Sequence, residues 1–236
     1  MKKINYLTYW NQQVNVLRPD FSNEWKEKYF NETREFFEGV NSFVDVGCGS
    51  GDFIIENNYM FDKIIGIEFS EFMIENAQQI IKERNIPNIT MFKSNATDIN
   101  LYIKEKVDVI YSRGLIQYLT NVQLQLFIKN SISLLNENGF LMHMDIPNKA
   151  MRTFYLMNLH KTEESYSDFE LALKYFKTKF YIFRKSGIKH FDDSIGYWYS
   201  FSEIRQIAEE FGLKVDFYYS KLQPFSYRFH AKFYKN

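Results

Sequence analysis

Cysteine, proline and net charge are scarce in this 236-residue chain. It has one cysteine, four prolines, and 29 basic against 29 acidic residues, so its formal net charge is zero. A single cysteine excludes an internal disulfide and indicates a reducing compartment, so we expect a cytoplasmic protein. A zero net charge removes the electrostatic argument for a nucleic-acid partner or an anionic membrane surface.

Long apolar runs and metal-binding motifs are also missing. No stretch approaches the ~20 apolar residues of a membrane span, and the first residues lack the apolar core of a signal peptide. No group of His, Cys and Asp has the spacing of a metal site, so we expect no metal. The length fits a single domain over residues 1–236 with a large core.

The most informative segment lies between residues 43 and 68. An apolar strand over 43–46 leads into glycines at every second position: Gly47, Gly49 and Gly51. Glycine lets the backbone turn sharply and approach a ligand closely, and the amides of the following helix start would face that ligand. A second strand, 63–67, ends in Glu68, which is placed to accept hydrogen bonds from a ribose diol. This order predicts a nucleoside-binding half-site.

The residue after the loop indicates which nucleoside. A dinucleotide fingerprint ends in Gly or Ala, whereas this chain has Asp52, a poor neighbour for a pyrophosphate. The pattern D-x-G-x-G-x-G, from Asp45 to Gly51, resembles motif I of the class I S-adenosylmethionine-dependent methyltransferases. The resemblance implies S-adenosyl-L-methionine as cofactor and S-adenosyl-L-homocysteine as product. Asp45 and the loop, with Cys48, would receive the charged methionine end, and Glu68 the ribose.

Strand and helix patterns alternate along the rest of the chain. Further strands are expected over 89–94, 107–111 and 140–146. Helices are expected over 22–38, 71–84 and 121–135, the last of them stopped by Asn138-Gly139. Such alternation predicts a parallel sheet with helices on both faces, and right-handed crossovers place the functional loops at the carboxyl edge.

The tail differs from this alternation. A helix over 201–211 precedes strands over 214–219 and 228–234, and the link between them is too short for a parallel crossover. An antiparallel pair is therefore expected, as at the end of the methyltransferase fold. The resemblance implies an α/β, doubly wound, seven-stranded, mostly parallel sheet of order 3-2-1-4-5-7-6, with the last strand antiparallel.

Further cofactor residues follow from the resemblance. Phe69 matches a position that often lies against the adenine. Asn95 and Ala96 match the segment that reads the adenine edge, although relatives often have Asp where this chain has Asn95, which could equally be a turn residue. Ser112 follows the fourth strand, where the methionine moiety is usually held. Trp10 lies in a segment that resembles the helix closing over the cofactor in many relatives.

Two segments are expected around the carboxyl edge. Residues 1–40 would form N-terminal helices that close over the site. Residues 148–200, which are rich in Phe, Tyr and Trp, would form a mostly helical cap insertion. Most of these aromatics are expected to pack in the core of the cap.

Polar and aromatic residues near this edge predict where the methyl acceptor binds. We expect the acceptor to contact Gln117, Tyr118, Tyr197, Trp198, Arg228 and His230. Arg228 and His230 share one face of the last strand, and Arg228 suits a phosphate or carboxylate, with a structural ion pair as the alternative.

Asp145, at the end of the fifth strand, and His190 are the candidate catalytic groups. Asp145 could instead cap a helix, and His190 could be a surface histidine. Relatives often carry a histidine near Gln117. This chain lacks it, and its absence weakens a simple histidine-base mechanism. In many such enzymes, holding the nucleophile in line with the methyl group is the main contribution.

These observations favour S-adenosylmethionine-dependent transfer to a small molecule. The segment from Asp145 through the cap to His230 faintly resembles methyltransferases of bacterial surface-polysaccharide pathways, which implies O-methylation of a sugar, a phosphate-bearing compound or a polysaccharide precursor. N-methylation of a small molecule, RNA or protein stays open, as does a non-catalytic regulatory subunit. An NAD-linked oxidoreductase is disfavoured by Asp52. The sequence does not choose between monomer and homodimer.

Overall fold

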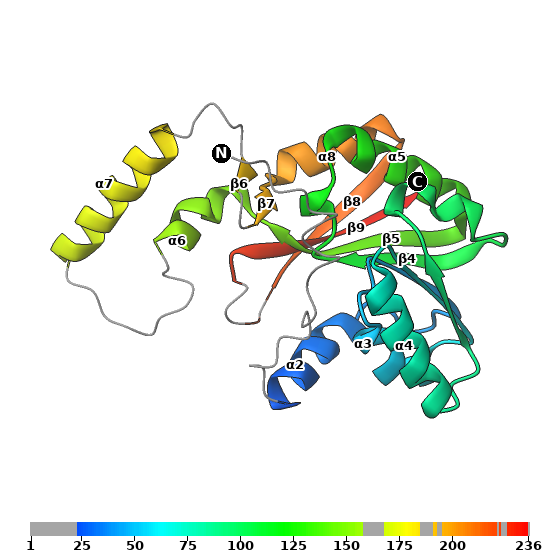
Figure 1. Cartoon of the computed structure of the whole chain (residues 1–236). Helices are drawn as coiled ribbons and strands as arrows, with labels where there is room; N and C mark the ends of the chain where they lie inside the picture. Colours follow the sequence, from blue (N-terminus) through cyan, green and yellow to red (C-terminus); the bar gives the residue numbers. More distant parts are fainter. Residues whose placement is uncertain are drawn as a thin grey trace.

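A seven-stranded sheet forms the centre of the fold (Figure 1). The computed structural model describes residues 23–157, 168–184, 191–192, 195–220, 222 and 226–235. The strands are β1 (Ser42–Val46), β2 (Lys63–Glu68), β3 (Ile89–Lys93), β4 (Val107–Arg113), β5 (Leu135–Pro147), β8 (Leu213–Tyr219) and β9 (Arg228–Lys235). Their order is β3-β2-β1-β4-β5-β9-β8, and β9 runs antiparallel to both of its neighbours. The predicted order is confirmed, with β8 and β9 as the sixth and seventh strands.

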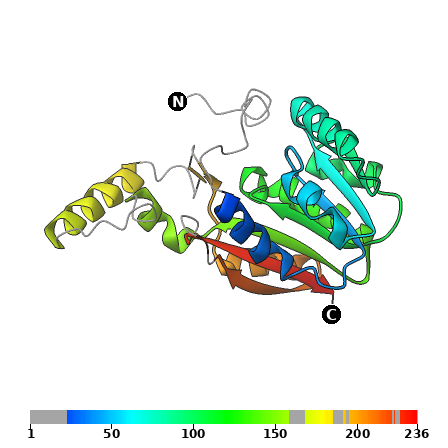
Figure 2. The same ribbon diagram turned by 90° about the horizontal axis from the view of Figure 1, so that it is seen from below.

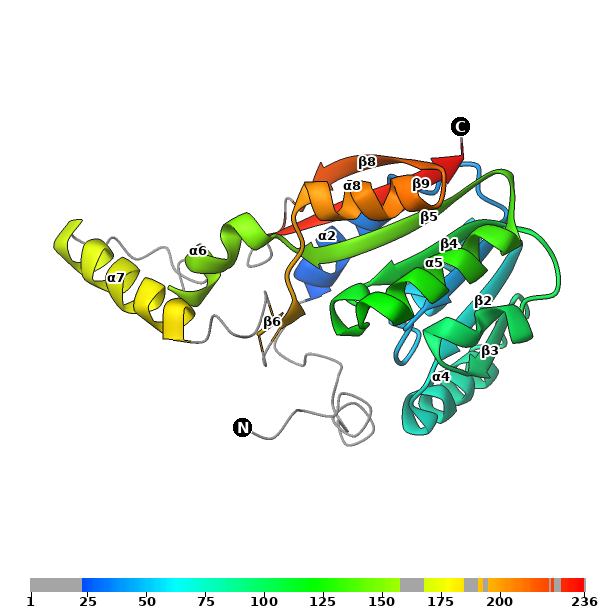
Figure 3. The same cartoon turned by 90° about the horizontal axis from the view of Figure 1, so that it is seen from above.

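Helices cover both faces of this sheet, as predicted. The α-helices are α2 (Asn23–Arg34), α3 (Asp52–Glu56), α4 (Glu71–Glu83), α5 (Asn121–Leu134), α6 (Arg152–Leu156), α7 (Asp168–Arg184) and α8 (Phe201–Glu210). Figure 3 shows α5 and α8 over one face, with α2 beneath the sheet. Within the described part of the chain, no helix combines the length and apolar composition needed to cross a bilayer.

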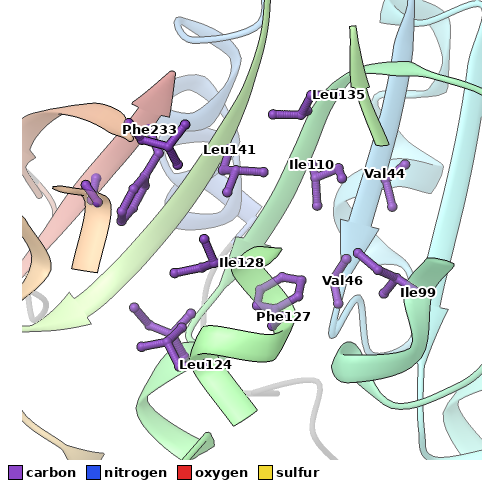
Figure 4. Packing of buried hydrophobic residues seen from close by; sticks show 14 of the residues in the cluster. Val44, Val46, Ile99, Ile110, Leu124, Phe127, Ile128, Leu135, Leu141 and Phe233 are labelled. Carbon is purple, nitrogen blue, oxygen red and sulfur yellow. The ribbon is translucent and has the colours of Figure 1, made fainter. Parts of the chain in front are cut away.

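The alternation of side chains along β1 explains this two-sided packing. Phe43 joins the cluster formed with α2, α3 and α4, whereas Val44 and Val46 join the cluster under α5 and α8. Figure 4 shows Phe127 of α5 facing the central strands in this second cluster. Successive residues of a strand point to opposite faces, so one short apolar run anchors both layers. It thereby fixes the position of Asp45, one residue before the end of β1.

The junction between α5 and β5 corrects one prediction. Asn138-Gly139 does not stop the helix, because β5 already begins at Leu135, which pairs with Val107. Asn136 Nδ2 donates to Asp108 Oδ1 at 2.6 Å and holds the strand start against β4. A Cβ at Gly139 would lie 3.0 Å from the carbonyl oxygen of Asp108. The glycine therefore permits close strand approach and is not a helix stop.

The insertion after β5 is helical where it is described, but it is not packed as expected. Helix α7 packs against α6, and Figures 1 and 2 show it beyond α6, apart from the sheet. The side chain of Phe176 is 70% exposed, and Leu173, Tyr175, Phe180 and Tyr181 are also exposed. The prediction that the aromatics of the cap are core is therefore wrong for α7.

Candidate active site

The glycine loop between β1 and α3 is held in a left-handed backbone conformation. Its glycines have φ values of +76°, +57° and +75° at Gly47, Gly49 and Gly51. The N–H groups of Gly47 and Cys48 both donate to the carbonyl of Ile67 on β2, at 2.7 and 3.2 Å. These two loop amides are therefore used within the protein. Our expectation concerned the amides at the start of the following helix, α3, and it stays a prediction. The loop serves mainly to fix the distance between the ends of β1 and β2.

Glu68 ends β2 directly beside this loop, and its side chain is buried. Its Oε1 accepts from the N–H groups of Phe69 and Ser70, both at 2.9 Å, and its Oε2 accepts from Gly49 at 3.1 Å. Burial raises the pKa of this carboxyl, and the three amides oppose the rise. Because a carboxylate offers about four acceptor positions, one remains on Oε2 for a ligand hydroxyl.

Asp45 is the penultimate residue of β1, and it pairs with Gly66, two residues before Glu68 on β2. It is buried, and no hydrogen-bond donor among the described residues reaches its carboxylate. Burial raises the pKa of Asp45 to about 8; the nearby Glu68 charge adds to the rise, and Arg113 opposes it. Two buried carboxylates at adjacent strand ends favour a ligand that carries positive charge and hydroxyl donors.

Cys48 and Gly66 show why the loop can lie so close to β2. A Cβ at Gly66 would lie 2.4 Å from Met91 Sδ and 3.1 Å from Cys48 Sγ, so only glycine leaves room for both. Burial, with the charges of Asp45 and Glu68, raises the pKa of the Cys48 thiol, so the thiol stays protonated. Sequence reasoning missed Gly66; a glycine inside an otherwise β-branched strand is the signal that could have identified it.

The expected adenine-side residues lie along the same edge. Phe69 is half-buried and follows Glu68, and Ala96 begins the short 3₁₀-helix η2 (Ala96–Leu101). Asn95 is exposed, and its Nδ2 lies 3.5 Å from Asp98 Oδ2. Its side chain makes no capping hydrogen bond to η2. Trp10 lies outside the described residues.

Ser112 lies beside a core histidine, His143. Its Oγ lies 2.8 Å from His143 Nδ1, and both side chains are buried. Burial lowers the pKa of His143 to about 3, so this imidazole is neutral. Strand β4 extends two residues further than expected, which brings Arg113 into the edge as well.

Asp145 occupies an unusual position at the end of β5. Its φ is +59°, in the left-handed region that non-glycine residues rarely adopt, and its carboxylate accepts from Arg113 Nε at 2.7 Å. Burial alone would raise its pKa, but Arg113, His230 and Arg228 hold the pKa at about 2. The backbone N–H of Asp145 donates to His230 Nδ1 at 3.1 Å. Strain of this kind concentrates at functional sites.

The acceptor-side residues meet around the 3₁₀-helix η3 (Ile116–Tyr118). Arg228 is buried; it donates to the carbonyl of Asp145 at 2.7 Å and to Gln117 Oε1 at 3.2 Å. A Cβ at Gly196 would lie 2.3 Å from the carbonyl oxygen of Gln117. Glycine at this position therefore allows the backbone around Gly196 to pack closely against η3. The structure thus brings Gln117, Tyr118, Tyr197, Arg228 and His230 to one edge.

Trp198, another residue expected to contact the acceptor, is held by aromatic packing. Trp198 is 2% exposed and packs with Tyr155 and Tyr227 in a small separate cluster. This packing explains its burial without a ligand contact. His190 lies outside the described residues.

A groove of about 550 Å³ lies between α2 and the β8–β9 pair. It is lined by Glu32, Glu35, Phe36, Phe217, Tyr218, Tyr219, His230 and Lys232. None of these residues belongs to the glycine loop, so this groove is separate from the paired carboxylates. Among the described residues, no group of three His, Cys, Asp or Glu side chains is arranged to hold a metal ion.

This geometry agrees with a family assignment. A family model described as a methyltransferase domain matches residues 40–194, more than half of the chain. The chain therefore belongs to this family, and its fold is that of the class I S-adenosylmethionine-dependent methyltransferases.

Individual relatives are more distant. A tRNA (guanine-N(7)-)-methyltransferase of Oceanobacillus iheyensis is 32% identical over 89 residues, which are 36% of this chain and 42% of that protein. The chain spans less than half the length of the curated relatives that it matches.

Solved structures match over almost the whole chain. The N-methyltransferase NodS from Bradyrhizobium japonicum, in complex with S-adenosylhomocysteine, has a TM-score of 0.61 at 15% identity and covers 97% of this chain and 95% of its own. Magnesium protoporphyrin IX methyltransferase from Synechocystis, with bound S-adenosylmethionine, has a TM-score of 0.60 at 14% identity and covers 99% and 93%. At such identities the likeness shows a common fold.

Proposed function

We propose that the protein transfers a methyl group from S-adenosylmethionine to a small-molecule acceptor at the carboxyl edge of its sheet. The observation that supports this most strongly is the pair of buried carboxylates, Asp45 and Glu68, beside the glycine loop. The bound cofactor would supply a methyl group on a positively charged sulfonium. Asp45 would face the ammonium group of the methionine end, and the remaining acceptor position of Glu68 would bind a ribose hydroxyl.

For the acceptor, we favour an oxygen nucleophile on a sugar, a phosphate-bearing compound or a polysaccharide precursor. Tyr118 and Tyr197 are half-buried near η3, where an acceptor could pack against them, and the zero net charge gives no basis for binding a nucleic-acid backbone. With a pKa of about 2, Asp145 is a weak base. Its suggested role is therefore to orient the acceptor, whereas a role for His190 as base rests on sequence alone.

RNA is the second candidate acceptor, because curated relatives of this chain are named as tRNA and RNA methyltransferases. Their similarity covers only 36% of this chain. It is therefore compatible with a shared cofactor half and a different acceptor half.

Transfer of a labelled methyl group distinguishes these candidates. The purified full chain is incubated with methyl-labelled S-adenosylmethionine and, separately, with sugar phosphates, nucleotide sugars, bulk tRNA and a protein extract. Label in a sugar-containing product supports the proposal, and label only in tRNA or protein overturns it. Calorimetric binding of S-adenosylhomocysteine without any transfer would instead favour a regulatory subunit.

A further inference from the structure

We propose that Arg113 is a positioning residue that ties helix α2 to the cofactor-binding strand ends, so that docking of α2 and binding of the cofactor support each other. The inference rests on the proposed cofactor site at Asp45 and Glu68. Arg113 ends β4 and follows Ser112 directly, and its side chain is only 8% exposed.

The contacts of Arg113 join two parts of the chain that are far apart in sequence. On the sheet side, its Nε donates to Asp145 at 2.7 Å. On the helix side, its guanidinium donates to the Tyr29 carbonyl and to Glu32, both at 3.3 Å, and to the hydroxyl of Thr33. The guanidinium also lies over the ring of Tyr29. One planar cation thus holds both the end of β5 and the second half of α2.

This cluster is buried on both sides. The side chains of Glu32 and Asp145 are 9% and 6% exposed, so water cannot replace the guanidinium as their partner while α2 is docked. A buried ion pair adds little stability relative to apolar packing, but removing one partner leaves a buried charge without compensation. Arg113 therefore makes α2 docking specific: the helix lies either against the cation or away from it.

The same cation acts on the cofactor site. Asp45 pairs with Tyr111 in the sheet, two residues before Arg113. The charged and titratable groups around Asp45 are Glu68 on β2, Cys48 in the loop, and Tyr111 and Arg113 on β4. Among the groups that act on Asp45, Arg113 favours its ionised form, whereas burial and Glu68 oppose it.

Several charged and titratable groups also face Arg113 itself. Asp145, Tyr29, Tyr111 and Glu32 surround it, and the Asp145 carboxylate is also influenced by His230 and Arg228. A change at Arg113 therefore affects Asp45 directly, through charge, and α2 directly, through lost contacts. A purely structural ion pair would affect stability but not the charge of Asp45.

The test compares full-length variants by calorimetry with S-adenosylhomocysteine from pH 6 to pH 9. Arg113→Met should weaken binding at pH 7 by about five- to a hundredfold and move the rise in affinity to higher pH. Arg113→Lys keeps the charge but loses the planar set of donors, so it should restore the pH profile and only part of the affinity. Arg84→Met is the matched control, because it removes an arginine from the half-exposed Arg84–Glu56 pair.

Hydrogen exchange of the α2 amides tests whether docking of α2 is coupled to ligand binding. Its first measurement uses the wild-type chain and so does not depend on the folding of a variant. In the wild-type chain, S-adenosylhomocysteine should slow exchange over Asn23–Arg34. In Glu32→Gln, which keeps Arg113 and Asp145, the slowing should be smaller. A wild-type pH profile in Arg113→Met, or α2 exchange unaffected by the ligand in the wild-type chain, overturns the inference. Failure of the wild-type chain to bind S-adenosylhomocysteine at all would instead overturn the proposed function.

Discussion

The strand ends around Asp45 differ from the inserted helices α6 and α7 in which side chains they bury. At the strand ends, charged groups are buried: three backbone N–H groups hold Glu68, and Arg113 and Asp145 hold each other. In α7, by contrast, aromatic side chains are exposed, with Phe176 at 70%. The groups at the strand ends are therefore fixed in position by the fold itself, whereas the exposed aromatic side chains of α7 contribute little to the core.

The first way to test this contrast is to truncate one aromatic residue in the sheet core. Phe43 is 1% exposed and stacks on Phe61 with ring centroids 4.4 Å apart. Phe43→Ala should lower the free energy of unfolding by about 3–5 kcal/mol, from lost transfer energy and the cavity left behind. Urea unfolding followed by fluorescence measures this loss, and a loss below about 1 kcal/mol would show that the core tolerates the cavity.

Gly49→Val should remove most of the affinity for S-adenosylhomocysteine, by about a hundredfold or more. Its φ of +57° is strained for a β-branched residue. Relief of that strain would displace the Gly49 N–H that donates to Glu68, and a Cβ there would lie 3.7 Å from Met73 Sδ. Gly39→Val is the control, because Gly39 has a φ of +74°, lies outside the loop, and has no atom within 4 Å of the place that a Cβ would take. Equal loss of affinity in both variants would mean that general destabilisation, not displacement of the glycine loop, explains the effect.

Glu68→Ala should weaken binding of S-adenosylhomocysteine by about 1–3 kcal/mol, the range for hydrogen bonds to a charged group. Calorimetry measures the change, and Glu105→Ala, which removes an exposed carboxylate paired with Lys63, should leave affinity unchanged. Wild-type affinity in Glu68→Ala would contradict the ribose assignment.

The pH dependence of binding should reveal Asp45. Its pKa is about 8 without ligand, and the positively charged methionine end favours the ionised carboxylate, so binding lowers this pKa and releases a proton. Affinity should therefore rise by up to about tenfold per pH unit as the pH approaches 8, and then level off. Asp45→Asn should flatten this profile; an unchanged slope in that variant would assign the dependence to another group.

The smallest effect is expected in the insertion. Phe176→Ala should change the free energy of unfolding by less than about 0.5 kcal/mol, as for other surface substitutions. The same urea experiment as for Phe43→Ala measures it. A loss comparable to that of Phe43→Ala would show that α7 is packed in solution and would remove the contrast between the two regions.

Local signals were enough to predict the strands, the glycine loop and the terminal acid of the first half of the sheet. The strand, the glycines, the second strand and its terminal acid lie within residues 43–68, and each is recognised by its immediate neighbours. The antiparallel pair β8–β9 was also predicted, because a short link excludes a parallel crossover.

Long-range contacts could not be predicted in the same way. The Arg113 cluster brings together Glu32 and Asp145, and no local pattern marks an arginine after a buried strand as the partner of a particular helix. The start of β5 was predicted too late, because pairing with β4 outweighs the turn preference of Asn138-Gly139. The exposed face of α7 was read as core because amphipathicity does not say whether a partner is present.

The backbone N–H of Asp145 also selects one tautomer of His230. A ring nitrogen that accepts a hydrogen bond carries no proton, so the single proton of the neutral imidazole resides on Nε2. That nitrogen lies 3.6 Å from Glu32 Oε2. The neutral ring therefore has no free lone pair to offer an incoming hydroxyl, so in this hydrogen-bonding state His230 cannot accept a proton from it.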